Sequence, residues 1–158
     1  MAQRKKIITT VDPKHRNFAA FKNVSLFKPN LKELREGLNI EIDDSSDEAM
    51  LRDLLEASKL LHERQGIDIV MTTLSSKGMY ACDFRNGEPR PILVPSCARA
   101  VSDVSGAGDT VISVITLALA AGIGLEDAVR LANTAGGIVC EQVGVVPIDR
   151  ERLMKEMQ

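Results

Sequence analysis

The chain has 158 residues, enough for one domain, with 44% hydrophobic residues, 27% charged residues and a net charge of −2. This charge gives no electrostatic reason to expect a nucleic acid or an anionic membrane surface as a partner, and aromatic residues, at 3%, are too few for base stacking. The longest apolar run, residues 111–123, is too short to span a bilayer. The three cysteines are widely spaced and form no CxxC pair, and no signal peptide is recognisable, so we expect a cytoplasmic protein.

Strands and helices alternate along the first part of the chain. Residues 6–11 form a β-branched run closed by a proline, which is typical of a buried strand, and residues 25–27 form a shorter one. Asn30 is placed to cap a helix that runs to about residue 38. Residues 43–47 are polar and indicate a loop, and residues 48–64 carry an apolar stripe at helical spacing, which Gly66 ends.

The second part begins with strands and ends with helices. Residues 67–73 predict a buried strand, and residues 78–84 and 90–94 flank an Asn-Gly turn signal that is typical of a hairpin. Helices are expected at residues 107–121 and 125–140, with a last amphipathic segment from Asp149. The alternation predicts an α/β fold in three layers, with a mainly parallel sheet covered by helices.

One short stretch contains candidate functional residues. Gly106, Ala107 and Gly108 stand where a loop becomes the helix of residues 107–121, and small residues there leave the first N–H groups of the helix open to an anion. Asp109 lies in the first turn of that helix, where its carboxylate would lie close to the bound anion. A purely structural interpretation is equally open, in which Asp109 only favours the helix N-terminus and the glycines only turn the chain.

The segment Asp103-Val104-Ser105-Gly106-Ala107-Gly108-Asp109-Thr110 resembles the signature of the ribokinase-like carbohydrate kinases, the phosphofructokinase-B superfamily. Lys28-Pro29-Asn30-Leu31-Lys32-Glu33 resembles the family's Pro-Asn-x-x-Glu motif. Thr73 to Gly78 resembles its Thr-x-Gly-x-x-Gly segment, with Ser75 in place of the first glycine, and Ala132 to Gly136 resembles the helix near the adenine. The likeness is greatest to the subgroup that phosphorylates D-glycero-D-manno-heptose 7-phosphate, the kinase half of ADP-heptose synthase.

The resemblance implies roles for individual residues. Asp109 would be the general base for the sugar hydroxyl, and Gly106, Ala107 and Gly108 would form the anion hole for the transferred phosphoryl group. Residues implied to bind ATP are Lys14, Asn30, Glu33, Thr73, Ser75, Gly78 and Asn133. Residues implied to organise metal ions are Glu33 for Mg²⁺, and Asp103 and Ser105 for a monovalent cation such as K⁺. For most of these residues an ordinary local role stays open: a capping box for Asn30 and Glu33, a solvated loop position for Lys14, and loop hydrogen bonds for Asp103 and Ser105.

The resemblance covers residues 1–158 as the C-terminal, nucleotide-binding half of such a kinase domain, truncated at its N-terminal side. It implies ATP and a sugar phosphate as small-molecule partners. A truncated sheet leaves an open edge, so we expect self-association into a homo-oligomer. The alternative is a non-catalytic nucleotide-binding or interaction module derived from this fold.

Overall fold

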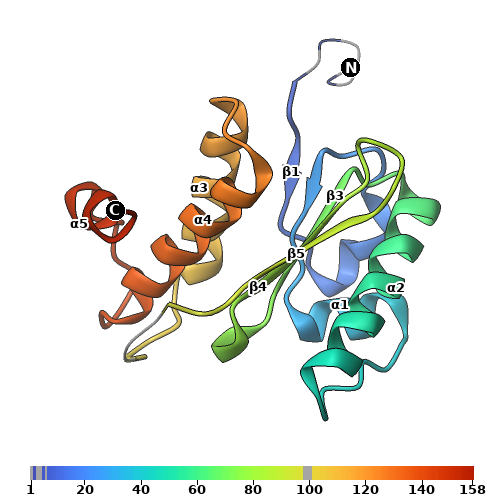
Figure 1. Ribbon diagram of the computed structural model, residues 1–158, viewed down its shortest axis with the longest axis horizontal. Coiled ribbons are helices and arrows are strands. Elements are labelled where there is room, and N and C mark those ends of the chain that lie inside the picture. The colour runs from blue at the N-terminus through green and yellow to red at the C-terminus, as the bar shows by residue number, and fades with distance from the viewer. Residues whose placement is uncertain (1, 3–4, 6, 98–100) are drawn as a thin grey trace. The chain divides into compact units, whose positions relative to one another are not determined.

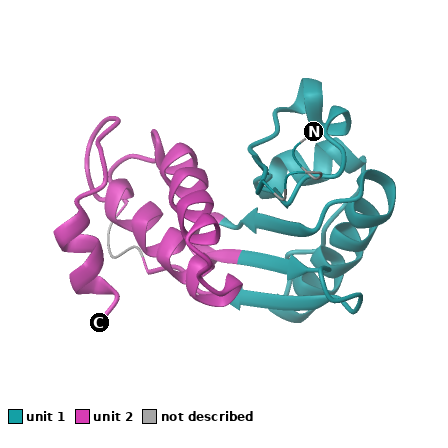
Figure 2. Cartoon of the chain, turned by 90° about the horizontal axis from the view of Figure 1, so that it is seen from above, with its two compact units in different colours: residues 1–74, 80–93 teal, residues 75–79, 94–158 magenta. Residues whose placement is uncertain are grey.

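The computed structural model describes residues 2, 5, 7–97 and 101–158 (Figure 1). The chain divides into two compact units (Figure 2). Unit 1 comprises Met1–Leu74 and Tyr80–Leu93, and unit 2 comprises Ser75–Met79 and Val94–Gln158. Lys6, with which the first predicted strand begins, lies outside the described residues.

Five strands form one sheet in the order β1-β2-β3-β4-β5. They are β1 (Thr10–Val11), β2 (Leu26–Phe27), β3 (Ile69–Thr73), β4 (Met79–Asp83) and β5 (Arg90–Val94). β1 pairs parallel with β2, and β2 pairs parallel with β3, so the carboxyl ends of these three strands meet at one edge. β4 and β5 are joined by a short turn, so they run antiparallel. The predicted α/β class is confirmed, although β1, β2 and β3 are shorter than the sequence indicated.

The helices of unit 1 begin and end at the residues that the sequence marked. α1 (Leu31–Leu38) has Asn30 as its N-cap. α2 (Asp47–Gln65) begins one residue earlier than predicted, because the Ser46 side chain accepts a hydrogen bond from the Ala49 N–H (3.1 Å). α2 ends at Gly66, which takes the left-handed conformation (φ 66°) and donates its N–H to the His62 carbonyl.

The core of unit 1 lies between these helices and the sheet. Leu34 of α1 and Leu54 of α2 are fully buried with Phe27 of β2. A short 3₁₀ helix, η2 (His15–Ala20), was not predicted. It is held by Phe18, whose ring packs edge-on against Phe27 (5.1 Å between centroids) and lies directly on Gly37 of α1. This contact fixes the loop that carries Lys14 beside the first turn of α1.

The described residues of unit 2 form a short 3₁₀ helix, η3 (Ser75–Lys77), and three α-helices that match the predicted ranges closely. They are α3 (Ala107–Ala120), α4 (Leu125–Cys140) and α5 (Arg150–Glu156). α3 and α4 approach closely where Gly136 faces Val111, since a Cβ at residue 136 would lie 2.8 Å from Val111 Cγ2. Asp149 caps α5, and Leu153 packs it against α4. Within the described ranges, none of the helices has the length and apolar character that crossing a membrane requires.

The contact between Phe18 and Gly37 predicts a stability effect. In Gly37→Ala the added Cβ overlaps the Phe18 ring, and such overpacking costs about 1–3 kcal/mol, of which the better helix propensity of Ala returns about 1 kcal/mol. We expect chemical denaturation to show a net loss in the free energy of unfolding. The control is Gly37→Ala combined with Phe18→Leu, in which the smaller side chain makes room and the loss shrinks. A single Gly37→Ala variant that is more stable than the wild type would contradict this account of η2.

Candidate functional site

Four predicted residues of unit 1 come together at the carboxyl ends of β1, β2 and β3. Lys14 Nζ lies 3.7 Å from a carboxylate oxygen of Glu33, and Glu33 is bonded to Asn30. Asn30 in turn forms an isolated parallel bridge with Thr73, at the end of β3. The carboxyl edge of a parallel sheet is where ligands bind in open α/β folds, so this grouping supports a common site in unit 1.

Two residues of this edge were missed by sequence reasoning. Lys28 is only 3% exposed, and its ammonium group lies 3.0 Å from a carboxylate oxygen of Asp12. The other oxygen of Asp12 lies 3.4 Å from Lys14 Nζ. Their positions in the sequence could have indicated the ion pair. Asp12 directly follows β1 and Lys28 directly follows β2, and parallel pairing of two strands brings the residues that follow them together. Two ammonium groups therefore share the Asp12 carboxylate, and with Glu33 the edge carries two ammonium groups and two carboxylates.

Asn30 and Glu33 form a complete capping box. The Asn30 side chain accepts from the Glu33 N–H (2.8 Å), and a Glu33 carboxylate oxygen accepts from the Asn30 N–H (2.9 Å). The second Glu33 oxygen is the one that faces Lys14, at 3.7 Å from its Nζ. The local role considered for this pair is thus present in the structure.

In unit 2 the loop before α3 leaves two backbone N–H groups without an acceptor among the described residues. Gly106 takes the left-handed conformation (φ 77°), which a residue with a side chain adopts only at a cost. Ala107 donates its N–H to the Val104 carbonyl, whereas the N–H groups of Gly108 and Asp109 have no acceptor in the described part of the chain. These two N–H groups lie at the positive end of the helix dipole.

Asp109 is exposed and does not cap α3. Gly106, the N-cap residue, makes no side-chain hydrogen bond, and the Asp109 carboxylate forms no hydrogen bond or ion pair with a described residue. Its backbone carbonyl accepts from the Ser113 hydroxyl (2.7 Å), which is an ordinary contact within a helix. Asp109 therefore makes no capping contact, while its place in the first turn of α3 agrees with the helix-dipole interpretation as well as with a functional one.

Asp103 holds the anion loop in place. One of its oxygens accepts from the Ser105 N–H (2.9 Å), and the other accepts from the Gly144 N–H (2.9 Å). These hydrogen bonds, led by that of Ser105, lower the pKa of Asp103 below its ordinary value of 3.8. The loop hydrogen bonds considered for Asp103 and Ser105 are thus present, and both carboxylate oxygens are engaged.

Ser75, Gly78 and Asn133 belong to a second part of unit 2. Ser75 takes a left-handed conformation (φ 56°), which explains why glycine suits this position. Gly78 (φ 95°) lies so close to the backbone of residues 94–96 that a Cβ there would overlap the Val94 carbonyl. Asn133 is buried and its amide donates to the Pro95 carbonyl (2.8 Å). Gly78 and Asn133 therefore contact the same segment after β5.

A family model described as "pfkB family carbohydrate kinase" matches residues 4–151. The chain belongs to the pfkB family of carbohydrate kinases. Among curated proteins it is 40% identical over 148 residues to the bifunctional protein HldE of Desulfatibacillum aliphaticivorans, covering 94% of this chain and 28% of HldE. It is 37% identical to HldE of Syntrophotalea carbinolica, covering 99% of this chain and 30% of that protein. The chain thus spans less than a third of these curated relatives.

Solved structures agree with this family assignment. Phosphofructokinase-2 from Escherichia coli, solved in complex with substrates and products, matches with a TM-score of 0.81 and 26% identity, over 99% of this chain and 48% of that enzyme. Arabidopsis thaliana ribokinase, solved with ribose and ATP, has the same fold, with a TM-score of 0.75, 22% identity and coverage of 98% of this chain and 48% of that one. The predicted ribokinase-like fold is confirmed.

The carboxylates of this pfkB-family chain fit Mg²⁺ better than they fit a closed metal cage. Among the described residues, no group of three or more His, Cys, Asp or Glu is arranged as a metal site. Mg²⁺ is usually bound by one or two carboxylates together with phosphate oxygens and water. The Glu33 oxygen that faces Lys14 and the carboxylate of Asp12 are hard oxygen donors of this kind at the carboxyl edge of the sheet.

Asp103 accepts two hydrogen bonds through separate oxygens, whereas Asp149 accepts two through one oxygen. We therefore expect Asp→Asn substitutions at these two positions to have different effects. In Asp103→Asn only one side-chain oxygen remains to accept, so we expect the Gly144 or the Ser105 amide to lose protection in hydrogen exchange followed by NMR. Asp149→Asn is the matched control, because a single oxygen of Asp149 accepts from both Glu151 and Arg152, and Asn retains that oxygen. Equal protection in wild type and Asp103→Asn would show that the carboxylate does not hold the loop.

The same contact has a defined pH dependence. Since the folded-state pKa of Asp103 is lowered, the stabilisation is complete above the ordinary value of 3.8 and is lost as the pH falls through the folded-state pKa. Exchange protection of the two amides is expected to follow this acid titration in the wild type.

Proposed function

We propose that this chain is the nucleotide-binding and catalytic half of an ATP-dependent sugar-phosphate kinase. The observation that carries the proposal is the Asp109 carboxylate, which stands beside two unbonded N–H groups at the start of α3 and has no partner among the described residues. A carboxylate next to an anion site is unfavourable for binding alone, because it repels the anion. It is favourable when the carboxylate removes a proton from the group that attacks the anion.

The chemistry follows from the residues of each unit. Asp109 accepts the proton of the acceptor hydroxyl as that oxygen bonds to the γ-phosphorus of ATP, and the bond between the γ-phosphorus and the bridging oxygen breaks to release ADP. The free N–H groups of Gly108 and Asp109 stabilise the charge on the transferred phosphoryl oxygens. In unit 1, Lys14 and Lys28 supply positive charge for nucleotide phosphates. Phosphoryl transfer depends mainly on such positioning and charge stabilisation.

The cofactors assigned to this chain are part of the proposal. Mg²⁺ would be held by Glu33 with Asp12, and when bound it neutralises phosphate charge. Thr73, Ser75, Gly78 and Asn133 would lie along the nucleotide, with Asn133 near the base. A monovalent cation near Asp103 and Ser105 is supported by phosphofructokinase-2 from Escherichia coli, 26% identical over 99% of this chain, which has also been solved in complex with potassium.

The proposed substrate is D-glycero-D-manno-heptose 7-phosphate, phosphorylated at its anomeric hydroxyl as a precursor of ADP-heptose. The support is the likeness of residues 28–31, 75–79 and 103–112 to the heptose-phosphate kinases, together with 34–40% identity to HldE proteins. A cytoplasmic location and a homo-oligomeric state stay predictions. For oligomerisation, phosphofructokinase-2, at 25% identity, has been solved as a tetrameric inhibited form.

Calorimetry with ATP and Mg²⁺, followed by an ADP-release assay with heptose 7-phosphate and with fructose 6-phosphate, tests the proposal. We expect ATP binding, and turnover that is faster with the heptose phosphate. ATP binding without turnover on either sugar would favour the alternative, a nucleotide-binding module. No binding to a chain that circular dichroism shows to be folded would contradict both.

Asp109→Asn separates the general base from a structural residue. Asn keeps the size of the side chain but cannot take the proton, and loss of a general base typically lowers the rate by ~10²–10⁴. We expect kcat to fall by that factor while the Kd for ATP stays unchanged, because the carboxylate addresses the acceptor hydroxyl. Glu33→Gln is the contrasting variant, which is expected to weaken Mg²⁺-dependent ATP binding. An Asp109→Asn variant that retains more than about a third of the wild-type kcat, well outside this range, would remove the general-base assignment.

A further inference from the structure

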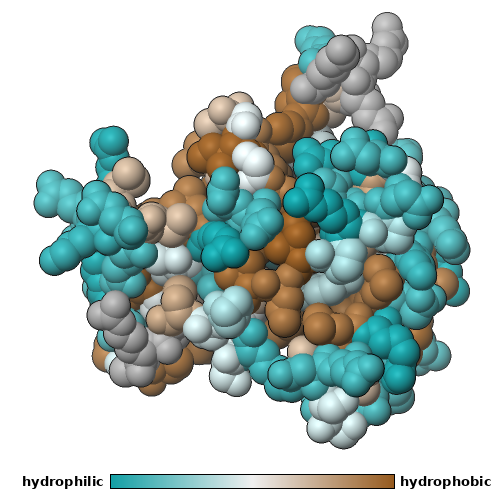
Figure 3. Space-filling model, in the orientation of Figure 1, coloured by the Kyte–Doolittle hydropathy of each residue, from teal (hydrophilic) through white to brown (hydrophobic). Residues whose placement is uncertain are grey.

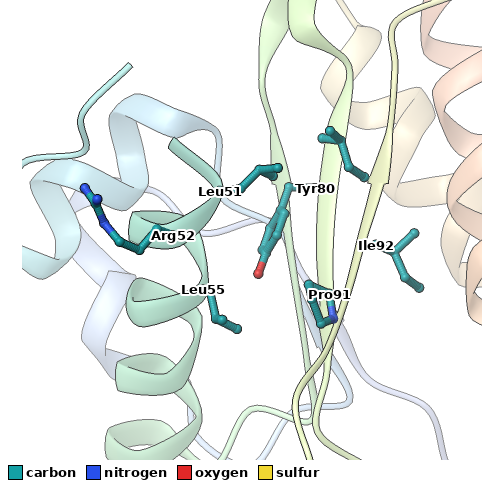
Figure 4. Close-up of a pocket in the computed structure, with 7 residues that line it drawn as sticks. Leu51, Arg52, Leu55, Tyr80, Pro91 and Ile92 are labelled. Carbon is teal, nitrogen blue, oxygen red and sulfur yellow. The ribbon is translucent and has the colours of Figure 1, made fainter. Parts of the chain in front are cut away.

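Unit 1 contains an apolar groove of about 330 Å³ between α2 and the β4–β5 hairpin (Figure 4). Leu51 and Leu55 of α2 form one side, and Pro91, Ile92 and Leu93 of β5 form the other. On the face shown in Figure 3, the surface over α1 and α2 is mainly hydrophilic, with hydrophobic side chains set between. Nothing in the described part of the chain indicates what covers this groove. A side chain whose contacts do indicate a ligand lies in unit 2 instead.

Asn133 of α4 directs its amide nitrogen toward the segment that follows β5. The side chain is 7% exposed, and its Nδ2 donates to the Pro95 carbonyl (2.8 Å). The same nitrogen lies 3.7 Å from Cys97 Sγ, a weak acceptor, and the Cys97 thiol in turn donates to the Asn133 backbone carbonyl (3.5 Å). An amide nitrogen carries two hydrogens, so both donors of Asn133 are used by residues of unit 2.

The amide oxygen of Asn133 is left as an acceptor. It accepts no hydrogen bond from a described residue, and it is not one of the described side-chain atoms that are fully buried without a partner, so it keeps some exposed surface. Turning the amide over would place this oxygen against the Pro95 carbonyl and would lose both contacts of the nitrogen. The orientation is therefore fixed, and Asn133 offers a ligand an acceptor and no donor.

We propose that Asn133 selects the nucleotide base by accepting a hydrogen bond from an exocyclic amino group, and that Cys97 is a positioning residue that holds the Asn133 amide for this purpose. The inference rests on the proposed function, in which the base lies near Asn133. Adenine carries an amino group where guanine and hypoxanthine carry a carbonyl oxygen. A carbonyl oxygen that faced the fixed Asn133 oxygen would leave two acceptors with no hydrogen between them. The site therefore favours an adenine nucleotide.

Calorimetry of the whole chain with ATP and with inosine triphosphate, each with Mg²⁺, tests this inference. The two nucleotides share the ribose and the phosphates, and their bases differ in the amino or carbonyl group that faces Asn133. We expect ATP to bind about two- to tenfold more tightly, the effect of one net hydrogen bond. Equal affinities would overturn the selection of the base and leave the proposed nucleotide binding standing. Binding of neither nucleotide to the folded chain would overturn both.

Asn133→Ala removes the acceptor. It is expected to raise the Kd for ATP about two- to tenfold, to the value for inosine triphosphate, and to remove the preference between the two nucleotides. Asn86→Ala is the matched control, because Asn86 is an exposed residue of the turn between β4 and β5, and it should change neither Kd. An Asn133→Ala variant that keeps the wild-type ratio of the two Kd values would overturn the assignment of Asn133.

Cys97→Ala tests the positioning role and leaves the hydrogen bond from Asn133 to Pro95 in place, so it also serves if Asn133→Ala does not fold. We expect the ratio of the two Kd values to fall, because the amide loses one of the contacts that fix its orientation. Cys97→Ser, which keeps both a donor and an acceptor, should restore the ratio. A Cys97→Ala variant with the full wild-type ratio would overturn the positioning role.

Discussion

The ammonium group of Lys28, buried at the end of β2, sets the arrangement of the whole carboxyl edge in unit 1. A buried charge without its partner costs about 3–5 kcal/mol, so Lys28 requires Asp12 at 3.0 Å. Asp12 directly follows β1, which ties this ion pair to the parallel pairing of β1 with β2. The same carboxylate also pairs with Lys14, whose loop is held beside α1 by the contact of Phe18 with Gly37. The ion pair that joins the ends of β1 and β2 thus also places two ammonium groups and two carboxylates at this edge.

In unit 2 the corresponding constraint is geometric. The loop before α3 must reverse direction and still present N–H groups outward, which the left-handed conformation of Gly106 achieves. Val145 lies against this glycine, since a Cβ there would be 3.0 Å from Val145 Cγ1. Asp103 reaches across to Gly144, so its carboxylate joins the anion loop to the segment that carries Val145. The proposed phosphate contacts of unit 1 are therefore charged side chains, whereas those of unit 2 are backbone N–H groups in a loop held by Asp103.

Local signals in the sequence predicted local structure well. Asn30, Gly66 and Asp149 mark helix ends because their capping chemistry involves only residues close in sequence. The 3₁₀ helix η2 was missed because a contact with Gly37 on another helix stabilises it. Two other contacts were not predicted for the same reason. The Asp12–Lys28 ion pair depends on strand pairing, and the hydrogen bond from Gly144 to Asp103 joins residues far apart in sequence.

Glu33 and Asp109 show why the position of an acidic residue does not decide its role. Both lie third in their helices, where a carboxylate can bond back to the N-cap N–H. Asn30, the N-cap of α1, has extended backbone (φ −83°, ψ 170°), and its N–H meets Glu33. Gly106, the N-cap of α3, is left-handed (φ 77°, ψ −6°), and no bond to Asp109 forms. The left-handed glycine before α3 thereby also leaves the adjacent carboxylate unpaired, so one backbone conformation provides both the proposed phosphate donors and the proposed base.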